Sequence, residues 1–294
     1  MFLPGHRHRN RYVHRGACAE GNQEVTQRVG WAELPEALRV AIEQHTGEFI
    51  GGRQLGTGHN CLIGMRLHAA NGVYFLKGFR SDKVPAVRTQ QFERAVAPLV
   101  SGISPALAFS MDIAGWNVLG FHFLDGYRHA DLAPGSRDLD HIANTLRALA
   151  LIKVPDTLDV RRASQRYANY AGGDGSPFGG MVLCHTDLHK HNILVAEGEP
   201  MAKLVDWAWP TTGADWIDAA CVILQLISEG HTPKQAEAWG EQIAPFRRAP
   251  DDHVSLFVKA IRNLWEEIAE ADPQEWKTSV AVAANEWASH RNIA

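Results

Sequence analysis

Two acidic residues and one amide residue near the middle of the chain have the types and the spacing that magnesium chemistry needs. Asp187 and Asn192 lie in a polar loop after the apolar residues 181–184, and Asp206 follows a second apolar stretch at 202–205. A tight turn at 197–200 would fold the strands on either side of it into a hairpin, which places all three side chains at the same end. Two carboxylates and an amide oxygen form a hard-oxygen cluster that suits Mg²⁺ better than Zn²⁺.

The same loop has the residue types that phosphoryl transfer requires. One carboxylate can accept the proton of a hydroxyl group, while an amide and a second carboxylate hold the metal ions that bridge the phosphates of a nucleotide. The segment His185-Thr186-Asp187 with Asn192 resembles the His-x-Asp-x-x-x-x-Asn loop of the aminoglycoside phosphotransferase family, a branch of the protein-kinase-like fold that phosphorylates small molecules. Asp206-Trp207 is also typical of these small-molecule kinases. The resemblance implies that Asp187 is the catalytic base and that Asn192 and Asp206 bind the metal.

The loop is also rich in histidine, which raises a transition-metal site as an alternative. His185, His189 and His191 could form such a site with Asp187, but their order matches no metallohydrolase signature. We therefore expect His189 and His191 to be solvated loop residues. We expect His185 to support the loop through a hydrogen bond.

Upstream residues match the phosphate-binding parts of the same family. Residues 51–67 predict two strands around a turn with Gly56 and Gly58, and residues 72–78 predict a strand that carries Lys77 near its end. The resemblance implies that the glycine turn covers the nucleotide phosphates and that Glu93, on a predicted helix, orients Lys77 against them. A hairpin turn also needs glycines, however, and a helical glutamate among arginines can simply be exposed.

Two aromatic residues lie where the family binds adenine. Phe121 and Phe123 belong to a predicted strand that ends at Gly126, and the resemblance implies that the backbone near 120–123 contacts the purine. Core packing is the alternative function of the two rings.

The segment after Asp206 is rich in tryptophan and acid and would lie beside the acceptor. Its aromatic faces and carboxylates suit a cationic or sugar-like substrate, so Trp209, Asp215 and Trp216 are candidate substrate contacts. Asp218 begins an apolar helical stretch and is a natural N-cap. In the resembled fold an acid at this point braces the catalytic loop, and we expect that function for Asp218.

The order of the predicted elements indicates an α+β protein of the two-lobed, protein-kinase-like fold. Residues 1–24 are rich in Arg and His and predict a disordered basic tail. Residues 25–124 would form a lobe with an antiparallel sheet, and residues 125–294 a larger helical lobe with the catalytic loop and the acceptor site. Periodicity further predicts helices over 31–45, 138–149 and 160–170.

The charge and composition of the chain narrow the classes of partner and the compartment that we expect for it. The net charge of −4 argues against a nucleic-acid-binding protein, and no apolar run is long enough to predict a membrane span. The four cysteines are scattered and form no CxxC pair, which indicates a reducing cytoplasm.

The resemblance implies a Mg²⁺- and ATP-dependent transfer of the γ-phosphoryl group to a hydroxyl of a small molecule. An aminoglycoside, an amino sugar or a related cyclitol or antibiotic is the expected acceptor. A choline- or ethanolamine-type metabolite kinase is the first alternative, and an inactive nucleotide-binding pseudokinase is the second. Antibiotic resistance and primary metabolism are equally compatible with the sequence.

Overall fold

The computed structural model describes residues 28–55 and 61–293. The predicted basic tail over 1–24 and the two turn glycines, Gly56 and Gly58, lie outside the described residues.

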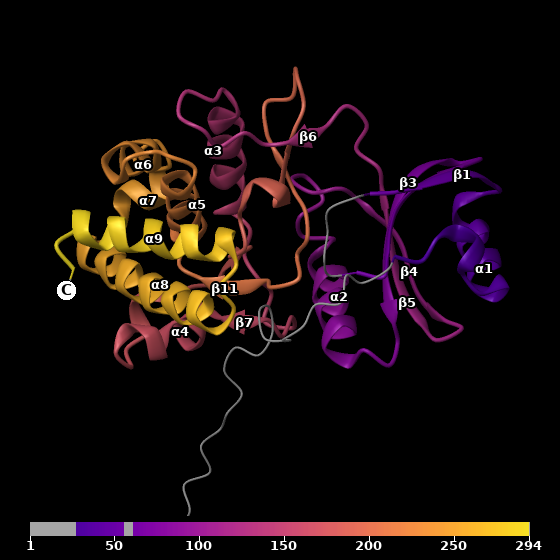
Figure 1. Cartoon of the computed structure of the whole chain (residues 1–294), viewed down its shortest axis with the longest axis horizontal. Helices are drawn as coiled ribbons and strands as arrows, with labels where there is room; N and C mark the ends of the chain where they lie inside the picture. The colour runs from indigo at the N-terminus through magenta and orange to yellow at the C-terminus, as the bar shows by residue number, and fades with distance from the viewer. Residues whose placement is uncertain (1–27, 56–60, 294) are drawn as a thin grey trace, which may run out of the picture.

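A five-stranded antiparallel sheet occupies one side of the molecule (Figure 1). Its strand order is β1-β2-β3-β5-β4. The strands are β1 (Phe49–Gln54), β2 (Ile63–Ala69), β3 (Gly72–Arg80), β4 (Leu107–Ile113) and β5 (Trp116–His122). α1 (Glu36–Thr46) packs against β4, and α2 (Val84–Val96) packs against β3 and β5.

A tight turn fixes the register between β4 and β5. Ile113 pairs with Trp116, so only Ala114 and Gly115 form the connection. Both turn residues have positive φ angles, 53° and 77°, as a two-residue hairpin of this handedness requires. The turn therefore sets which side chains of β5 stand opposite those of β4.

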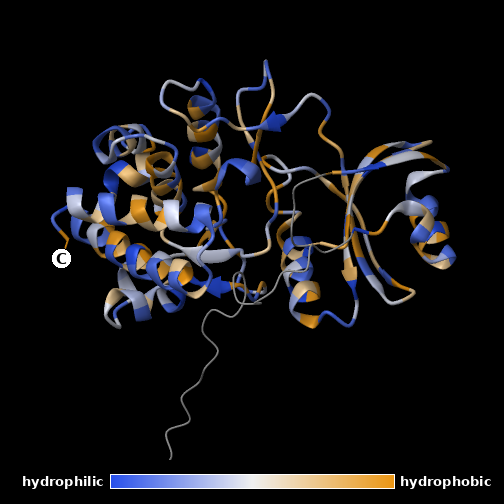
Figure 2. Ribbon diagram, viewed as in Figure 1, coloured by the Kyte–Doolittle hydropathy of each residue, from blue (hydrophilic) through white to orange (hydrophobic). Residues whose placement is uncertain are grey.

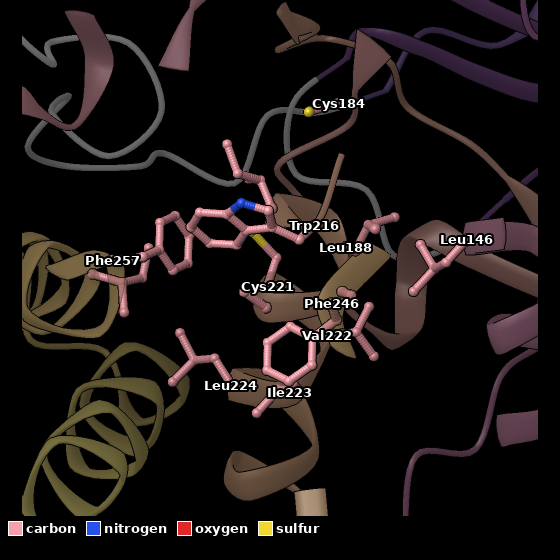
Figure 3. Packing of buried hydrophobic residues seen from close by; sticks show 14 of the residues in the cluster. Leu146, Cys184, Leu188, Trp216, Cys221, Val222, Ile223, Leu224, Phe246 and Phe257 are labelled. Atoms are coloured by element: carbon pink, nitrogen blue, oxygen red, sulfur yellow. The ribbon is translucent and has the colours of Figure 1, made fainter. Parts of the chain in front are cut away.

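The rest of the chain is mainly helical and forms the larger hydrophobic core. Figure 2 shows hydrophobic and hydrophilic residues alternating around these helices, and Figure 3 shows Trp216, Cys221 and Phe257 packed closely in the core. The predicted helix over 138–149 is present with Leu139, Ile142, Leu146 and Leu149 buried. The α-helices of this part are α3 (Asp138–Leu149), α4 (Ala163–Arg166), α5 (Ile217–Ser228), α6 (Pro233–Gly240), α7 (Ala244–Arg248), α8 (Asp251–Ala271) and α9 (Glu275–His290).

The strands of two small sheets alternate with α3 and α4 along the chain, after the large sheet and before α5. One has the order β10-β9-β6 and the other β7-β11-β8. Their strands are β6 (Arg128–His129), β7 (Arg161–Arg162), β8 (Val182–Cys184), β9 (Ile193–Val195), β10 (Lys203–Leu204) and β11 (Thr211–Gly213). The polar loop of 185–192 connects β8 to β9, so both sheets position it.

Two predicted helices were wrong in detail. Residues 31–33 form a separate 3₁₀ turn before α1, so the predicted helix begins later than expected, at Glu36. The stretch 160–170 is divided into β7, α4 and a second 3₁₀ turn (Ala168–Ala171). Arg161 and Arg162 pair in parallel with Thr211 and Thr212, so a contact distant in sequence overrides the local helical pattern.

Within residues 28–55 and 61–293, no helix combines the length and the apolar character needed to cross a lipid bilayer. The expected division of the chain near residue 125 stays a prediction.

Candidate active site

The loop after β8 brings Asp187, Asn192 and Asp206 together. The Asn192 amide donates to the Asp187 backbone carbonyl at 2.8 Å and to its carboxylate at 3.4 Å. The Val205 N–H donates to the Asn192 carbonyl at 3.0 Å, which holds the residue before Asp206 against the loop. The hairpin of β9 and β10 thus places the two carboxylates and the amide at one end.

Backbone strain marks both ends of this arrangement. Thr186 and Asp206 have positive φ angles of 62° and 63°, a conformation that β-branched residues in particular rarely adopt. Strain of this kind persists only where the surrounding contacts enforce it, and it concentrates at functional sites.

The buried carboxylate of Asp218 enforces the conformation at Thr186. It accepts hydrogen bonds from the backbone N–H groups of His185 and Thr186, both at 2.8 Å. Burial raises the pKa of Asp218 to about 6, although the two N–H groups and Arg166 favour its charged form. Asp218 lies inside α5 and does not cap it, because the helix begins at Ile217.

His185 is a buried support of the same loop. Its Nε2 atom lies 3.0 Å from the Val205 carbonyl, and its ring packs on Trp207 with centroids 4.5 Å apart. Burial lowers the pKa of His185, so the ring is neutral at pH 7. These contacts suit a structural function for the histidine.

Lys77 links the large sheet to this loop. Its ammonium group lies 2.8 Å from a carboxylate oxygen of Glu93 on α2 and 2.6 Å from one of Asp206. Desolvation would lower the pKa of Lys77, but the charges of Asp206 and Glu93 outweigh it and raise that pKa. Gln90 donates to the Lys77 carbonyl at 2.9 Å and fixes the strand against the same helix. The side chains of Lys77 and Glu93 therefore pair as the sequence predicted.

The donor set at the end of the hairpin fits a magnesium ion. Asn192 and Asp206 present an amide oxygen and a carboxylate, and Mg²⁺ commonly takes one or two such protein ligands beside water and phosphate oxygens. Among the described residues, no three His, Cys, Asp or Glu side chains are arranged to hold a metal ion. The Nε2 atom of His189 lies 3.9 Å from a carboxylate oxygen of Asp187.

The residues predicted to contact adenine lie at the end of β5. Phe121 is buried and pairs with Phe75 on β3. Phe123 is half-buried beneath the Arg66 guanidinium, which lies 4.4 Å from its ring centroid. Their contact with a purine stays a prediction.

The side chains of the three predicted acceptor contacts have different surroundings. Trp209 is half-buried and carries the Arg161 guanidinium over its ring at 4.5 Å. Asp215 faces Arg248 of α7 at 3.9 Å. Trp216 is only 3% exposed and packs against Phe257 in the core (Figure 3), so its ring is not accessible to a substrate in this structure.

Two arginines near the loop were missed by the sequence analysis. Arg166 donates to the Thr186 hydroxyl at 2.5 Å, and Arg161 covers Trp209. No local motif distinguishes them, since their proximity to the loop comes from the pairing of β7 with β11.

Known proteins resemble this chain in structure but not in sequence. No protein-family model matches the sequence, and no curated protein matches it either. The choline kinase LicA from Streptococcus pneumoniae superposes with a TM-score of 0.61 at 16% identity, over 86% of this chain and 98% of that one. An aminoglycoside phosphotransferase from Alicyclobacillus acidocaldarius gives 0.56 at 13% identity, over 90% and 98% of the two chains.

The chain has the protein-kinase-like fold of the small-molecule kinases. The microcompartment-associated aminopropanol kinase shares this fold with a TM-score of 0.54 at 14% identity, over 85% of this chain and 95% of that one. The predicted α+β, kinase-like fold is therefore confirmed. At these identities the likeness establishes the fold, and the function has to be argued from the site.

Proposed function

We propose that this protein transfers the γ-phosphoryl group of ATP, with magnesium, to a hydroxyl group of a small molecule. One observation carries the proposal: the catalytic loop brings together Asp187, Asn192 and Asp206, and Asp206 contacts the Lys77–Glu93 pair. The buried carboxylate of Asp218 holds this loop in its strained conformation. Phosphoryl transfer depends mainly on positioning and on charge stabilisation, which this set of groups supplies.

Each residue has a distinct function in the proposal. Asp187 orients the acceptor hydroxyl and takes its proton, and its carboxylate is held near Asn192 for that purpose. Lys77 presents a positive charge to the nucleotide phosphates. Asn192 and Asp206 would hold magnesium, which neutralises phosphate charge when bound. Cover of the phosphates by the Gly56–Gly58 turn stays a prediction.

The nucleotide part of the proposal has independent support. A second structure of LicA, with a TM-score of 0.56 at 14% identity, is in complex with AMP. In this chain Phe121 lies on β5 and Phe123 directly follows the end of that strand, and they remain the proposed adenine contacts. The buried free cysteines Cys61, Cys184 and Cys221 are compatible with the proposed cytoplasmic location.

The acceptor classes follow from the sequence resemblance. An aminoglycoside, an amino sugar or a related cyclitol is the first class, and choline or ethanolamine the second. The fold shared with a choline kinase supports the inclusion of the second class. The alternative to an enzyme is a pseudokinase, a protein that binds nucleotide without turnover.

Nucleotide binding and turnover measured together separate these functions. We expect ATP to bind in the presence of Mg²⁺, with at least 10-fold weaker binding after Asp206→Asn, because one metal ligand is lost. Addition of the right acceptor, from a panel of aminoglycosides, amino sugars, cyclitols, choline and ethanolamine, should then stimulate ATP consumption. ATP binding with no turnover for any hydroxyl compound supports the pseudokinase, whereas no Mg-ATP binding at all contradicts the kinase assignment of the loop.

A further inference from the structure

A single guanidinium group joins separate segments of the chain beside the catalytic loop. Arg166, the last residue of α4, donates from Nη1 to the Thr186 hydroxyl at 2.5 Å and to the Thr211 hydroxyl at 3.4 Å. Thr186 directly precedes Asp187, and Thr211 is the first residue of β11. The functions proposed so far leave Arg166 unused, although it contacts the residue next to the proposed base.

The two threonine hydroxyls share one acceptor. The Trp209 carbonyl accepts from Thr186 at 3.2 Å and from Thr211 at 3.0 Å. A guanidinium group can only donate hydrogen bonds, and a hydroxyl group has one proton to donate. Because both hydroxyls accept from Arg166, their own protons are directed to the Trp209 carbonyl, whose two lone pairs accept both. Arg166 therefore sets the direction of the whole network.

This network connects the segments that carry the two carboxylates of the site. Thr186 belongs to the loop with Asp187, whereas Trp209 lies three residues after Asp206. A shift of one segment against the other would stretch the bond between the Thr186 hydroxyl and the Trp209 carbonyl. The network is thus placed to fix the position of one carboxylate relative to the other.

Arg166 extends from a rigid base. α4 packs against β7 and β11 (Figure 1), and a Cβ atom on Gly213 of β11 would stand 2.9 Å from that of Ala163. Tyr167, the next residue after Arg166, is buried and packs edge-on against Phe257 with ring centroids 5.2 Å apart. A side chain that is already ordered at its base loses less conformational entropy when it holds a loop.

The backbone strain at Thr186 indicates why a hydroxyl is needed there. A φ angle of 62° is unfavourable for a β-branched residue, so contacts must enforce it. The Thr186 N–H donates to Asp218 at 2.8 Å, and its hydroxyl is held by Arg166 and Trp209. A residue without the hydroxyl would keep only the first of these two anchors.

We propose that Arg166 is a positioning residue for phosphoryl transfer, which holds Asp187 in place through the Thr186 hydroxyl and the Trp209 carbonyl. The inference rests on the proposed function and adds a residue to it. Placement matters because a shift of about 1 Å near the reacting groups can lower the rate about 100-fold. Nucleotide binding should depend less on Arg166, because the proposed phosphate contact, Lys77, lies outside the network.

A transition-state analogue tests the position of Asp187 without an identified acceptor. Mg²⁺, ADP and aluminium fluoride together mimic phosphoryl transfer, with water at the acceptor position. In full-length Arg166→Met we expect aluminium fluoride to bind the Mg–ADP-loaded protein about 10-fold or more weakly, while Mg–ADP alone binds within about 2-fold of the wild type. Asp187→Asn should show the same loss. Arg162→Met, at an exposed position of β7, is the matched control and should show neither change.

A double-mutant cycle tests whether Arg166 acts through Thr186. Thr186→Val removes the hydroxyl and keeps the branched shape, whereas Thr186→Ser keeps the hydroxyl. We expect Thr186→Val to weaken aluminium fluoride binding about as much as Arg166→Met, and Thr186→Ser to retain it within about 3-fold. The double variant should lose no more than about 3-fold beyond either single variant. Losses that multiply would mean that the two residues act independently, and they would overturn the inference.

Failure of this inference can be told apart from failure of the proposed reaction. Aluminium fluoride binding that is lost in Asp187→Asn but unchanged in Arg166→Met overturns the positioning function and leaves the phosphotransferase in place. Equal weakening of Mg–ADP and aluminium fluoride in Arg166→Met also overturns it, because the residue would then support the nucleotide site in general. Thr186→Val, which leaves α4 intact, supplies the same comparison if Arg166→Met does not fold.

Amide hydrogen exchange tests the network without any ligand. We expect Arg166→Met to accelerate exchange over residues 184–188 about 10-fold or more, because the loop loses an anchor, and Arg162→Met to leave it unchanged. A wild type that binds no aluminium fluoride with Mg–ADP would contradict the proposed function. Exchange that is unchanged in Arg166→Met would overturn the inference in either case.

Discussion

At the residue scale, the loop that carries the proposed base is held by a buried carboxylate, that of Asp218 on α5. Asp218 accepts both N–H groups that precede Asp187 and thereby keeps Thr186 in its strained, positive-φ conformation. Such a brace works best when it is ionised, since each carboxylate oxygen then accepts one of the two donors. The position of Asp187 should consequently depend on the protonation of Asp218.

The turnover number should fall as the pH drops below about 6. Burial raises the pKa of Asp218 to about 6 from its ordinary 3.8, and protonation converts one oxygen from an acceptor to a donor. In Asp218→Asn we expect a lower turnover number at pH 7.5, about 10-fold, and a flat profile between pH 5 and 7. If the turnover number of Asp218→Asn fell with pH in the same way as that of the wild type, the pH dependence would belong to another group.

The same group should make the folded protein more stable as the pH drops below about 6, while the turnover number falls. The folded state binds the Asp218 proton more tightly than the unfolded state, so this group's contribution is present below about pH 4 and is lost as the pH rises through 6. The free energy of unfolding should therefore fall by roughly 2–3 kcal/mol across this window relative to Asp218→Asn. Urea titrations of both proteins at each pH measure the difference.

The Lys77–Glu93 pair carries the second prediction at this scale. Glu93→Gln should lower kcat/KM for ATP at least 10-fold, because Lys77 then pairs only with Asp206 and loses its orientation toward the phosphates. Glu36→Gln, at an exposed position of α1, is the control and should leave the kinetics unchanged. Steady-state kinetics with varied ATP concentration measure kcat/KM for both variants. Equal values of kcat/KM would contradict a function for Glu93 in the nucleotide site.

At the element scale, the small β7-β11-β8 sheet positions the loop. Gly180 lies just before β8, and a Cβ atom there would stand 2.1 Å from the Gly213 carbonyl of β11. The close approach of the two backbones is thus possible only without a side chain. The sheet needs this approach to place Cys184 beside Thr211.

Gly180→Ala should lower the free energy of unfolding by about 1–3 kcal/mol and reduce turnover as well. Both effects follow because β8 must move away from β11, and the catalytic loop begins where β8 ends. Gly102→Ala is the matched control, since a Cβ atom there meets nothing within 4 Å. Chemical denaturation measures stability; a Gly180→Ala protein as stable as the Gly102→Ala protein would contradict the packing argument.

Local sequence patterns predicted some elements and not others for definable reasons. The helix α3 follows from the spacing of Leu139, Ile142 and Leu146, because one face of it meets the core. The strand at Arg161 was predicted as helix, since its partner Thr211 is distant in sequence. Trp216 was predicted near the substrate but lies in the core, because composition alone does not tell which way a ring points.

At the scale of the whole molecule, the proposed nucleotide site joins the sheet to the helical part. Lys77 of β3 contacts Asp206, and the Trp207 indole donates to the Ser104 hydroxyl at 2.8 Å in a buried position. A ligand that contacts both sides should stabilise the whole fold.

ATP should raise the melting temperature only when Mg²⁺ is present. At 100 times its dissociation constant a ligand adds about 2.7 kcal/mol, which corresponds to a rise of several degrees in a protein of this size. EDTA should abolish the rise, and Asp206→Asn should reduce it. An equal rise in EDTA would contradict the magnesium site at Asn192 and Asp206.

The fold and the proximity of Asp187, Asn192 and Asp206 could be predicted from sequence because their signal is local. The spacing from Asp187 to Asn192 is fixed by one loop, and Asp206 follows one hairpin later. The acceptor class could not be predicted in the same way. Arg161 and Arg166 come near the catalytic loop only through the pairing of β7 with the distant strand β11, which no local sequence pattern shows.

The most direct test of the central claim is acceptor-dependent, Mg²⁺-dependent ATP consumption by the wild type and by Asp187→Asn. The panel contains aminoglycosides, amino sugars, cyclitols, choline and sugar phosphates. We predict that at least one acceptor stimulates turnover by the wild type and that Asp187→Asn reduces it by about 100-fold or more, because the hydroxyl loses its base. Turnover that persists undiminished in Asp187→Asn would contradict the account.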